Sequence, residues 1–117
     1  IMHKGTALPL VKEKDAMTDA LIEMTSKGFG VAGVMKASEL VGVISDGDLR
    51  RNMTSLFERT ASQVAKKQPI VVSEDTLAVE ALKIMNVAGI TSLFVVDDRH
   101  QVLGLVNIHD LLRLGLS

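Results

Sequence analysis

The chain has 117 residues, 47% of them hydrophobic, which is enough for one small domain with its own core. Its 13 lysines and arginines nearly balance 14 aspartates and glutamates, so the formal net charge of -1 argues against partners held mainly by charge, such as nucleic acid. The absence of cysteine excludes disulfides, thiol catalysis and thiolate metal sites. No apolar run approaches the roughly 20 residues that span a bilayer, and no secretion signal is present, so we expect a soluble, cytoplasmic protein.

The sequence repeats itself once, which decides the architecture before any local pattern is read. Residues 9–11 match residues 69–71, and residues 42–51 match residues 104–113. We therefore predict two homologous units, residues 1–57 and 68–117, joined by a linker over residues 58–67. Because the first residue is Ile1 rather than Met, we also expect the chain to be a piece of a longer protein.

Each unit is predicted to begin with a short strand and a helix that buries one face. In the first unit Asp15 is the expected N-cap, and apolar residues then recur at steps of three and four as far as Gly28, which should end the helix in the left-handed conformation. In the second unit the same pattern runs from Asp75 or Thr76 to Gly89.

Two strands and a second helix complete each unit. Runs rich in β-branched and small apolar residues predict strands over residues 31–35, 40–44, 92–96 and 102–106. The second helices are expected from Asp48 to about Phe57 and from Asp110 to about Leu114, and residues 61–64 should form one helical turn in the linker. The predicted fold class is α/β (α+β), with two β-α-β-β-α repeats.

Neither unit can bury the apolar face of its own small sheet. We expect the two units to pack on each other about a pseudo-twofold axis, which creates two equivalent clefts where small ligands bind. We also expect a homodimer, because helix faces carrying Leu111, Leu112 and Leu114 should be exposed and need cover.

Several motifs resemble those of enzymes without their context. Residues 28–33 match G-x-G-x-x-G, but a helix precedes them and a strand follows, whereas a dinucleotide site needs the reverse order. Asp46 and Asp48 form a D-x-D pair without the further lysine and aspartate of a phosphotransferase, and no acidic residue closes a calcium loop there. These patterns predict no catalytic residues and no metal site.

The three histidines do not have metal-ligand spacing. His3, His100 and His109 share no i, i+4 pair on one helix, so a place at the surface or at the rim of a ligand site is expected for them.

The strongest signal lies where a strand passes into the second helix of each unit. There the chain reads GVISDGDLRR over residues 42–51 and GLVNIHDLLR over residues 104–113. An aspartate at a helix start can accept hydrogen bonds from two ribose hydroxyls, and a serine nearby can donate to a phosphate. Asp48 and Asp110 could equally be plain N-caps, and the two roles are compatible.

This junction pattern resembles the signature of CBS domains: Gly, two apolar residues, Ser or Thr, two variable residues, Asp and Leu. The duplicated order of elements is similar to a tandem CBS pair and covers essentially the whole chain. The resemblance implies a regulatory module in which Ser45 and Asp48 bind the phosphate and ribose of a nucleotide. The second unit departs from the signature, with Asn107 in place of the hydroxyl and His109 where the first unit has Gly47.

A closer resemblance is to the C-terminal CBS pair of bacterial D-arabinose 5-phosphate isomerases. The segments IMHKGTALPLV, SDGDLRR, LAVEALKIM, GITSLFVVD and NIHDLLRLG carry it. Ala65, Lys66 and Lys67 depart from the Met-Thr usual before the second repeat. The resemblance implies an N-terminal sugar isomerase domain before Ile1, in the pathway to the lipopolysaccharide sugar Kdo. The alternatives are a ligand-free module that only holds subunits together and an independent small enzyme.

The resemblance also implies a ligand. We expect CMP-Kdo, the nucleotide-activated end product, and as second choice an adenine nucleotide such as AMP or ATP. Arg51 should pair with a phosphate or sugar carboxylate in the same cleft. The candidate ligand-binding residues are Thr6, Ser45, Asp48, Arg51, Thr91, Asn107 and Asp110.

Overall fold

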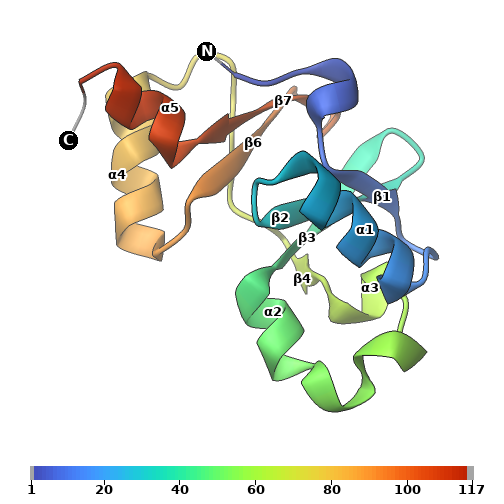
Figure 1. Ribbon diagram of the computed structural model, residues 1–117. Coiled ribbons are helices and arrows are strands. Elements are labelled where there is room, and N and C mark those ends of the chain that lie inside the picture. Colours follow the sequence, from blue (N-terminus) through green and yellow to red (C-terminus); the bar gives the residue numbers. More distant parts are fainter. Residues whose placement is uncertain (1, 116–117) are drawn as a thin grey trace. The chain divides into compact units, whose positions relative to one another are not determined.

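The strands of the protein form two separate sheets, one in each half of the chain (Figure 1). The computed structural model describes residues 2–115. These residues divide into an N-terminal unit, Pro9–Pro69, and a C-terminal unit made of residues 2–8 and 70–115. Residues 2–8, which lie in the first sequence repeat, thus pack with the second half of the chain.

The N-terminal unit is built on a four-stranded sheet of order β1-β2-β3-β4. β1 pairs with β2 in parallel, and the other neighbours are antiparallel. Its strands are β1 (Leu10–Lys12), β2 (Val31–Lys36), β3 (Glu39–Ser45) and β4 (Lys66–Lys67). Its helices are α1 (Met17–Lys27), α2 (Asp46–Arg51), the 3-10 helix η2 (Met53–Glu58) and α3 (Ala61–Val64).

The C-terminal unit repeats this plan with three strands in the order β5-β6-β7. β5 pairs with β6 in parallel, and β6 with β7 antiparallel. Its elements are the 3-10 helix η1 (Gly5–Ala7), β5 (Val71–Val72), α4 (Ala78–Ala88), β6 (Ser92–Val96), β7 (Val102–Asn107) and α5 (Ile108–Arg113). The predicted order of strand, helix, strand, strand and helix is therefore confirmed in both units, as are the predicted strands and the helical turn over residues 61–64.

Each unit has its own apolar core between its helices and its sheet. In the N-terminal unit Met17 and Ala20 of α1 are fully buried against Ile44 of β3. In the C-terminal unit Met85 of α4 and Leu105 and Leu111 are fully buried. The prediction that Leu111 is exposed is therefore wrong, because α5 turns this side chain into the core, while Leu112 and Leu114 of the same segment are exposed as predicted.

The two long helices end as predicted but begin differently. Gly28 and Gly89 end α1 and α4 in the left-handed conformation, with φ of 79° and 69°. The predicted N-caps are wrong, because Ala16 and Leu77 hold those positions without side-chain caps.

The reason is that the expected caps close the turns before the helices instead. The Asp15 carboxylate accepts from the Lys12 amide at 2.9 Å, and the Thr76 hydroxyl accepts from the Ser73 amide at 3.2 Å. Both are local turns of the kind that compete with capping.

The second helices start earlier than expected. α2 begins at Asp46 after the N-cap Ser45, and α5 begins at Ile108 after the N-cap Asn107, so Asp48 and Asp110 are not N-caps but the third residues of their helices. α2 also ends at Arg51, and the chain continues as η2, since Ser55 leaves the helical region with φ of −125°. Among residues 2–115, no helix is long and apolar enough to cross a membrane.

Candidate functional site

The junction of the N-terminal unit is a capping box between Ser45 and Asp48. Ser45 is extended and ends β3, and its amide and hydroxyl donate to Asp48 Oδ2 at 2.9 Å and 3.0 Å. The Asp48 backbone amide donates to the Ser45 hydroxyl oxygen at 3.4 Å. The S-x-x-D spacing thus joins the two predicted ligand residues directly, and it satisfies amides that the helix leaves without partners.

Arg51 completes this junction from the next turn of α2. Its Nη2 lies 2.5 Å from Asp48 Oδ1, so both carboxylate oxygens already have protein partners. Asp48 is only 6% exposed, whereas the Arg51 side chain is 62% exposed. An ion pair with one exposed partner contributes little, about 0.2 to 1 kcal/mol, so the guanidinium can swing to an anion at small cost.

The junction of the C-terminal unit has the same box with a different N-cap. The Asn107 side-chain oxygen accepts a hydrogen bond from the His109 backbone amide at 3.0 Å. The Asn107 backbone amide donates to Asp110 Oδ2 at 3.2 Å. Asn107 is buried, and its side-chain nitrogen donates to the Ser92 hydroxyl at 2.8 Å. The Asn107 side chain therefore links the first turn of α5 to the first residue of β6.

His3 contacts Asp110 from the other end of the chain. Its Nε2 lies 2.9 Å from Asp110 Oδ2, and Arg113 Nη2 lies 3.4 Å from the other carboxylate oxygen. Two backbone hydrogen bonds between His3 and Leu105, at 2.8 Å and 2.9 Å, fix this segment against β7. Sequence reasoning missed this contact, because no local spacing links residues so far apart.

Gly104 makes this close approach possible. A Cβ placed there would lie 2.5 Å from Met2 Sδ and 2.7 Å from the His3 carbonyl oxygen. Any larger residue must therefore push the N-terminal segment away from the sheet.

The predicted site residues are shared between the two units. Ser45 and Arg51 both contact Asp48 in the N-terminal unit. The C-terminal unit holds the other four, of which Asn107 and Asp110 are joined by a hydrogen bond. Thr6 and Thr91 are exposed, and in the described part of that unit no hydrogen bond links their side chains to Asn107 or Asp110. A single cleft that joins all seven residues stays a prediction.

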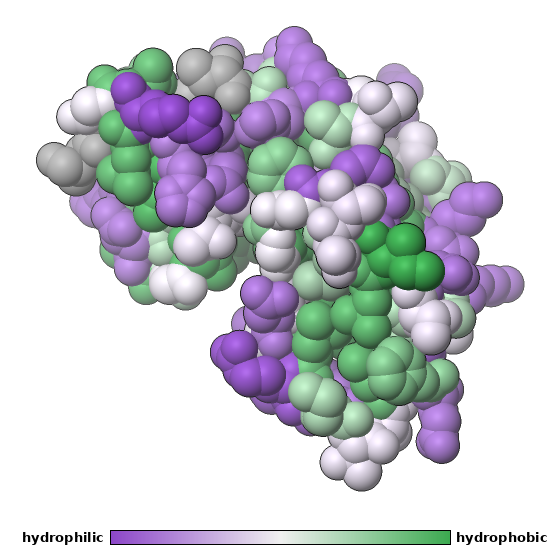
Figure 2. Space-filling view, viewed as in Figure 1, coloured by the Kyte–Doolittle hydropathy of each residue, from purple (hydrophilic) through white to green (hydrophobic). Residues whose placement is uncertain are grey.

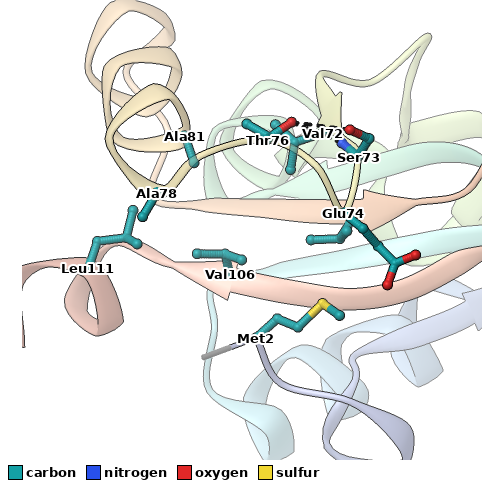
Figure 3. A pocket seen from close by; sticks show the side chains of 10 residues that line it. Met2, Val72, Ser73, Glu74, Thr76, Ala78, Ala81, Val106 and Leu111 are labelled. Carbon is teal, nitrogen blue, oxygen red and sulfur yellow. Dashed lines mark hydrogen bonds between the residues drawn. The ribbon is translucent and has the colours of Figure 1, made fainter. Parts of the chain in front are cut away.

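A pocket of about 270 Å³ opens in the C-terminal unit beside α4 and α5 (Figure 3). Val72, Ala81, Val106 and Leu111 line it with apolar side chains, and Glu74 lies at its rim. No predicted site residue lines it, and sequence patterns gave no sign of it.

The chain matches the family model described as CBS domain twice, over residues 1–55 and 61–117. It is 40% identical to arabinose 5-phosphate isomerase KdsD of Francisella tularensis over 99% of its own length and 36% of that protein. The corresponding values for KdsD of Escherichia coli are 38%, 99% and 36%. The chain thus spans about a third of the length of the curated relatives that it matches.

Two solved CBS structures share the fold at low identity. A crystal structure of CBSX2 in complex with AMP superposes with a TM-score of 0.83 at 23% identity, covering 97% of this chain and 91% of that one. The CBS domain pair of protein MJ0100, in complex with methylthioadenosine and S-adenosylmethionine, gives 0.85 at 21% identity, with 98% and 91% covered. Together with the repeated junction and the two β-α-β-β-α units, these matches establish that the chain belongs to the CBS domain family, as a tandem pair homologous to the C-terminal region of KdsD.

Proposed function

We propose that this chain is the nucleotide-sensing regulatory module of an arabinose 5-phosphate isomerase. The observation that carries the proposal is the 40% identity to KdsD over 99% of the chain. The chain matches only 36% of that enzyme, so isomerisation is assigned to the part outside the match, an N-terminal sugar isomerase domain of the same polypeptide. The module would work in the cytoplasm, where the pathway of the proposed isomerase would supply the ligand.

The ligand is proposed to be a nucleotide or nucleotide sugar that binds at the Ser45–Asp48–Arg51 junction. Asp48 offers a carboxylate suited to ribose hydroxyls, and Arg51 offers an exposed guanidinium suited to a phosphate or a sugar carboxylate. CMP-Kdo carries ribose hydroxyls, a phosphate and a sugar carboxylate, and it is our first choice. An adenine nucleotide is the second, supported by the AMP bound to the structurally similar CBSX2.

Binding to the 117-residue chain tests the ligand. Calorimetric titrations with CMP-Kdo, AMP and ATP should give saturable binding with CMP-Kdo tightest, and a ligand at 100 times its Kd should stabilise the fold by about 2.7 kcal/mol. The variant D48N should lose this binding. D46N is the matched control, since Asp46 is exposed in the same turn and the change removes the same charge.

A ligand-free role in holding subunits together is the second candidate, and it rests on exposed apolar side chains. Figure 2 shows hydrophobic surface over α1 and the segment after α2 in the N-terminal unit. Ile22, Met53 and Phe57 there are 67%, 64% and 67% exposed. A homodimer that covers them is expected under both proposals. Absence of binding by all three nucleotides, with the dimer intact in light scattering, would favour this candidate.

A further inference from the structure

The aspartate of the C-terminal junction is contacted by a histidine from outside the junction. His3 Nε2 lies 2.9 Å from Asp110 Oδ2, and because a carboxylate oxygen only accepts, Nε2 is the ring nitrogen that carries the hydrogen. The Asp110 side chain is 12% exposed and the His3 side chain is 35% exposed. The imidazole therefore takes up a hydrogen-bonding position on a carboxylate that has little contact with solvent.

Both oxygens of Asp110 have protein partners, and these partners differ in how easily they move. Oδ2 accepts from the Asn107 backbone amide as well as from His3, and the amide belongs to the capping box itself. Oδ1 lies 3.4 Å from Arg113 Nη2, and the Arg113 side chain is 76% exposed, so it can swing away at small cost. His3 is thus the partner that decides whether a ligand can reach Asp110.

Backbone hydrogen bonds keep His3 in this place. Its amide donates to the Leu105 carbonyl at 2.8 Å, and the Leu105 amide donates to the His3 carbonyl at 2.9 Å. A Cβ at Gly104 would lie 2.7 Å from the His3 carbonyl oxygen, so this close approach depends on the glycine. A ligand that displaces the imidazole must rotate it on a fixed backbone or pull the segment off β7.

The matching position of the N-terminal unit carries a lysine instead. Val43 and Leu105 correspond in the sequence repeat. Val43 pairs with Lys66, whereas Leu105 pairs with His3. Lys66 is exposed, and in the described part of its unit no hydrogen bond or ion pair joins its side chain to Asp48. The same strand position therefore contacts the aspartate in one unit and not in the other.

Asp48 is contacted by side chains that can give way to a ligand. The Ser45 hydroxyl donates to Asp48 Oδ2 at 3.0 Å, and a hydroxyl can turn its hydrogen elsewhere without any movement of the chain. The Arg51 side chain on the other oxygen is 62% exposed. A ligand can thus take Asp48 while the backbone around it stays in place.

We propose that His3 is an autoinhibitory residue that keeps nucleotides from Asp110, so that the C-terminal junction binds a ligand only when His3 moves away. Ribose hydroxyls donate to a carboxylate and therefore compete with His3 Nε2 for Asp110 Oδ2. The inference rests on the proposed function, because it concerns the same class of ligand. Docking of His3 and binding at Asp110 oppose each other, and by linkage each weakens the other by the same factor.

This competition would let the second junction report its occupancy. The chain is homologous to the C-terminal region of KdsD and matches 36% of that protein, so residues 2–8 lie on the side where the relative continues. A ligand that displaces His3 from Asp110 therefore loosens the segment that leads to the rest of such a protein. A ligand at Asp48 leaves that segment in place.

A gain of binding tests the autoinhibition. In the background of D48N, which removes the first junction, H3A should tighten binding of CMP-Kdo or AMP at least about tenfold in calorimetric titrations, because Asp110 regains an open acceptor position. The rescue variant H3Q keeps an amide donor near the position of Nε2 and should bind as weakly as D48N alone. K66A is the matched control at the same strand position and should change nothing, and H3A/D48N/D110N should lose the gained binding.

Amide hydrogen exchange gives a readout that needs no ligand. H3A should speed exchange at the Leu105 amide about fivefold or more, since the segment loses its side-chain contact, and H3Q should not. R113A, which removes the other side-chain contact of Asp110, is the control and should leave this amide unchanged. Unchanged exchange in H3A would overturn the claim that the contact holds residues 2–8, and urea unfolding of each variant checks that the fold is intact.

The binding outcomes separate this inference from the proposed function. Binding to the unaltered chain without any gain in H3A/D48N would overturn the autoinhibition and leave the proposed function standing. An equal gain in H3Q/D48N, or a gain that persists in H3A/D48N/D110N, would also overturn the autoinhibition alone. Absence of binding to every one of these proteins would overturn both.

Discussion

Each of the two strand-to-helix junctions has a capping box that ends in an aspartate, but the side chains that contact the two aspartates differ. Asp48 is paired with Arg51, one turn away on the same helix and largely exposed. Asp110 lies 3.4 Å from the equivalent Arg113 and in addition contacts His3, which belongs to a segment fixed on β7 by backbone hydrogen bonds. A ligand that takes Asp48 Oδ1 must displace the exposed side chain of Arg51, whereas a ligand that takes Asp110 must also compete with a residue held by the sheet. Duplicated motifs can therefore differ in ligand binding through contacts that lie outside the motif.

The largest expected effect concerns ligand binding at the first junction. D48A should weaken binding of the nucleotide ligand by about 1.5 to 3 kcal/mol, the range for a hydrogen bond to a charged group, and D110A should weaken it less. Calorimetric Kd values for both variants measure the difference. Equal losses, with unchanged unfolding curves, would show that the two junctions do not differ as proposed.

The second effect concerns the two glycines, Gly104 and Gly42, at which a neighbouring segment of the chain comes close to a strand of each sheet. G104A should destabilise the fold by about 2 kcal/mol, because the new Cβ meets the His3 carbonyl oxygen at 2.7 Å and the segment must shift. G42A places its Cβ 3.0 Å from Ala65 and 3.1 Å from the Lys66 carbonyl oxygen, so it should cost less. Urea unfolding of both variants checks the order, and a larger loss from G42A would contradict it.

The third effect concerns the N-caps. N107A removes the cap of α5 and the buried hydrogen bond to Ser92, and should cost about 1.5 kcal/mol. S45A removes the cap of α2 and a hydrogen bond to Asp48 that is only partly buried, and should cost about 1 kcal/mol. Thermal unfolding of the two variants side by side tests this ranking, which fails if S45A proves the more damaging.

The smallest effect concerns the partners of the two aspartates. H3A should lower the free energy of unfolding by about 1 kcal/mol, since Asp110 is mostly buried and loses a hydrogen bond. R51A should lower it by less than about 0.5 kcal/mol, because the guanidinium is exposed. An H3A variant as stable as R51A would mean that the segment at β7 is held by its backbone alone.

Local patterns predicted most of the fold. The strands follow from β-branched runs, and the ends of α1 and α4 follow from Gly28 and Gly89. The helix starts could not be read in this way, because Asp15 and Thr76 suit a turn as well as a cap, and only the surrounding backbone decides between the two. The strand Lys66–Lys67 also went unpredicted, since two lysines carry no strand pattern and pair only because β3 offers a free edge.

In the candidate site, too, some contacts could be predicted from the sequence and others could not. The contact between Ser45 and Asp48 could be predicted because a capping box lies within four consecutive residues. The contacts of Asn107 with Ser92 and of His3 with Asp110 depend on how strands and distant segments are brought together. Such contacts leave no periodic trace in a single sequence.

The pairing of His3 with Leu105 also has a consequence for the order in which the protein can be made. A ribosome delivers residues 2–8 before Pro9–Pro69, yet their partners in β7 emerge only after the whole of Pro9–Pro69 has been synthesised. The N-terminal unit is contiguous and can fold while translation continues, whereas the C-terminal unit must wait and then close a loop that encloses its neighbour. Such long-range pairing slows folding, so the C-terminal unit should be the last to acquire its native structure.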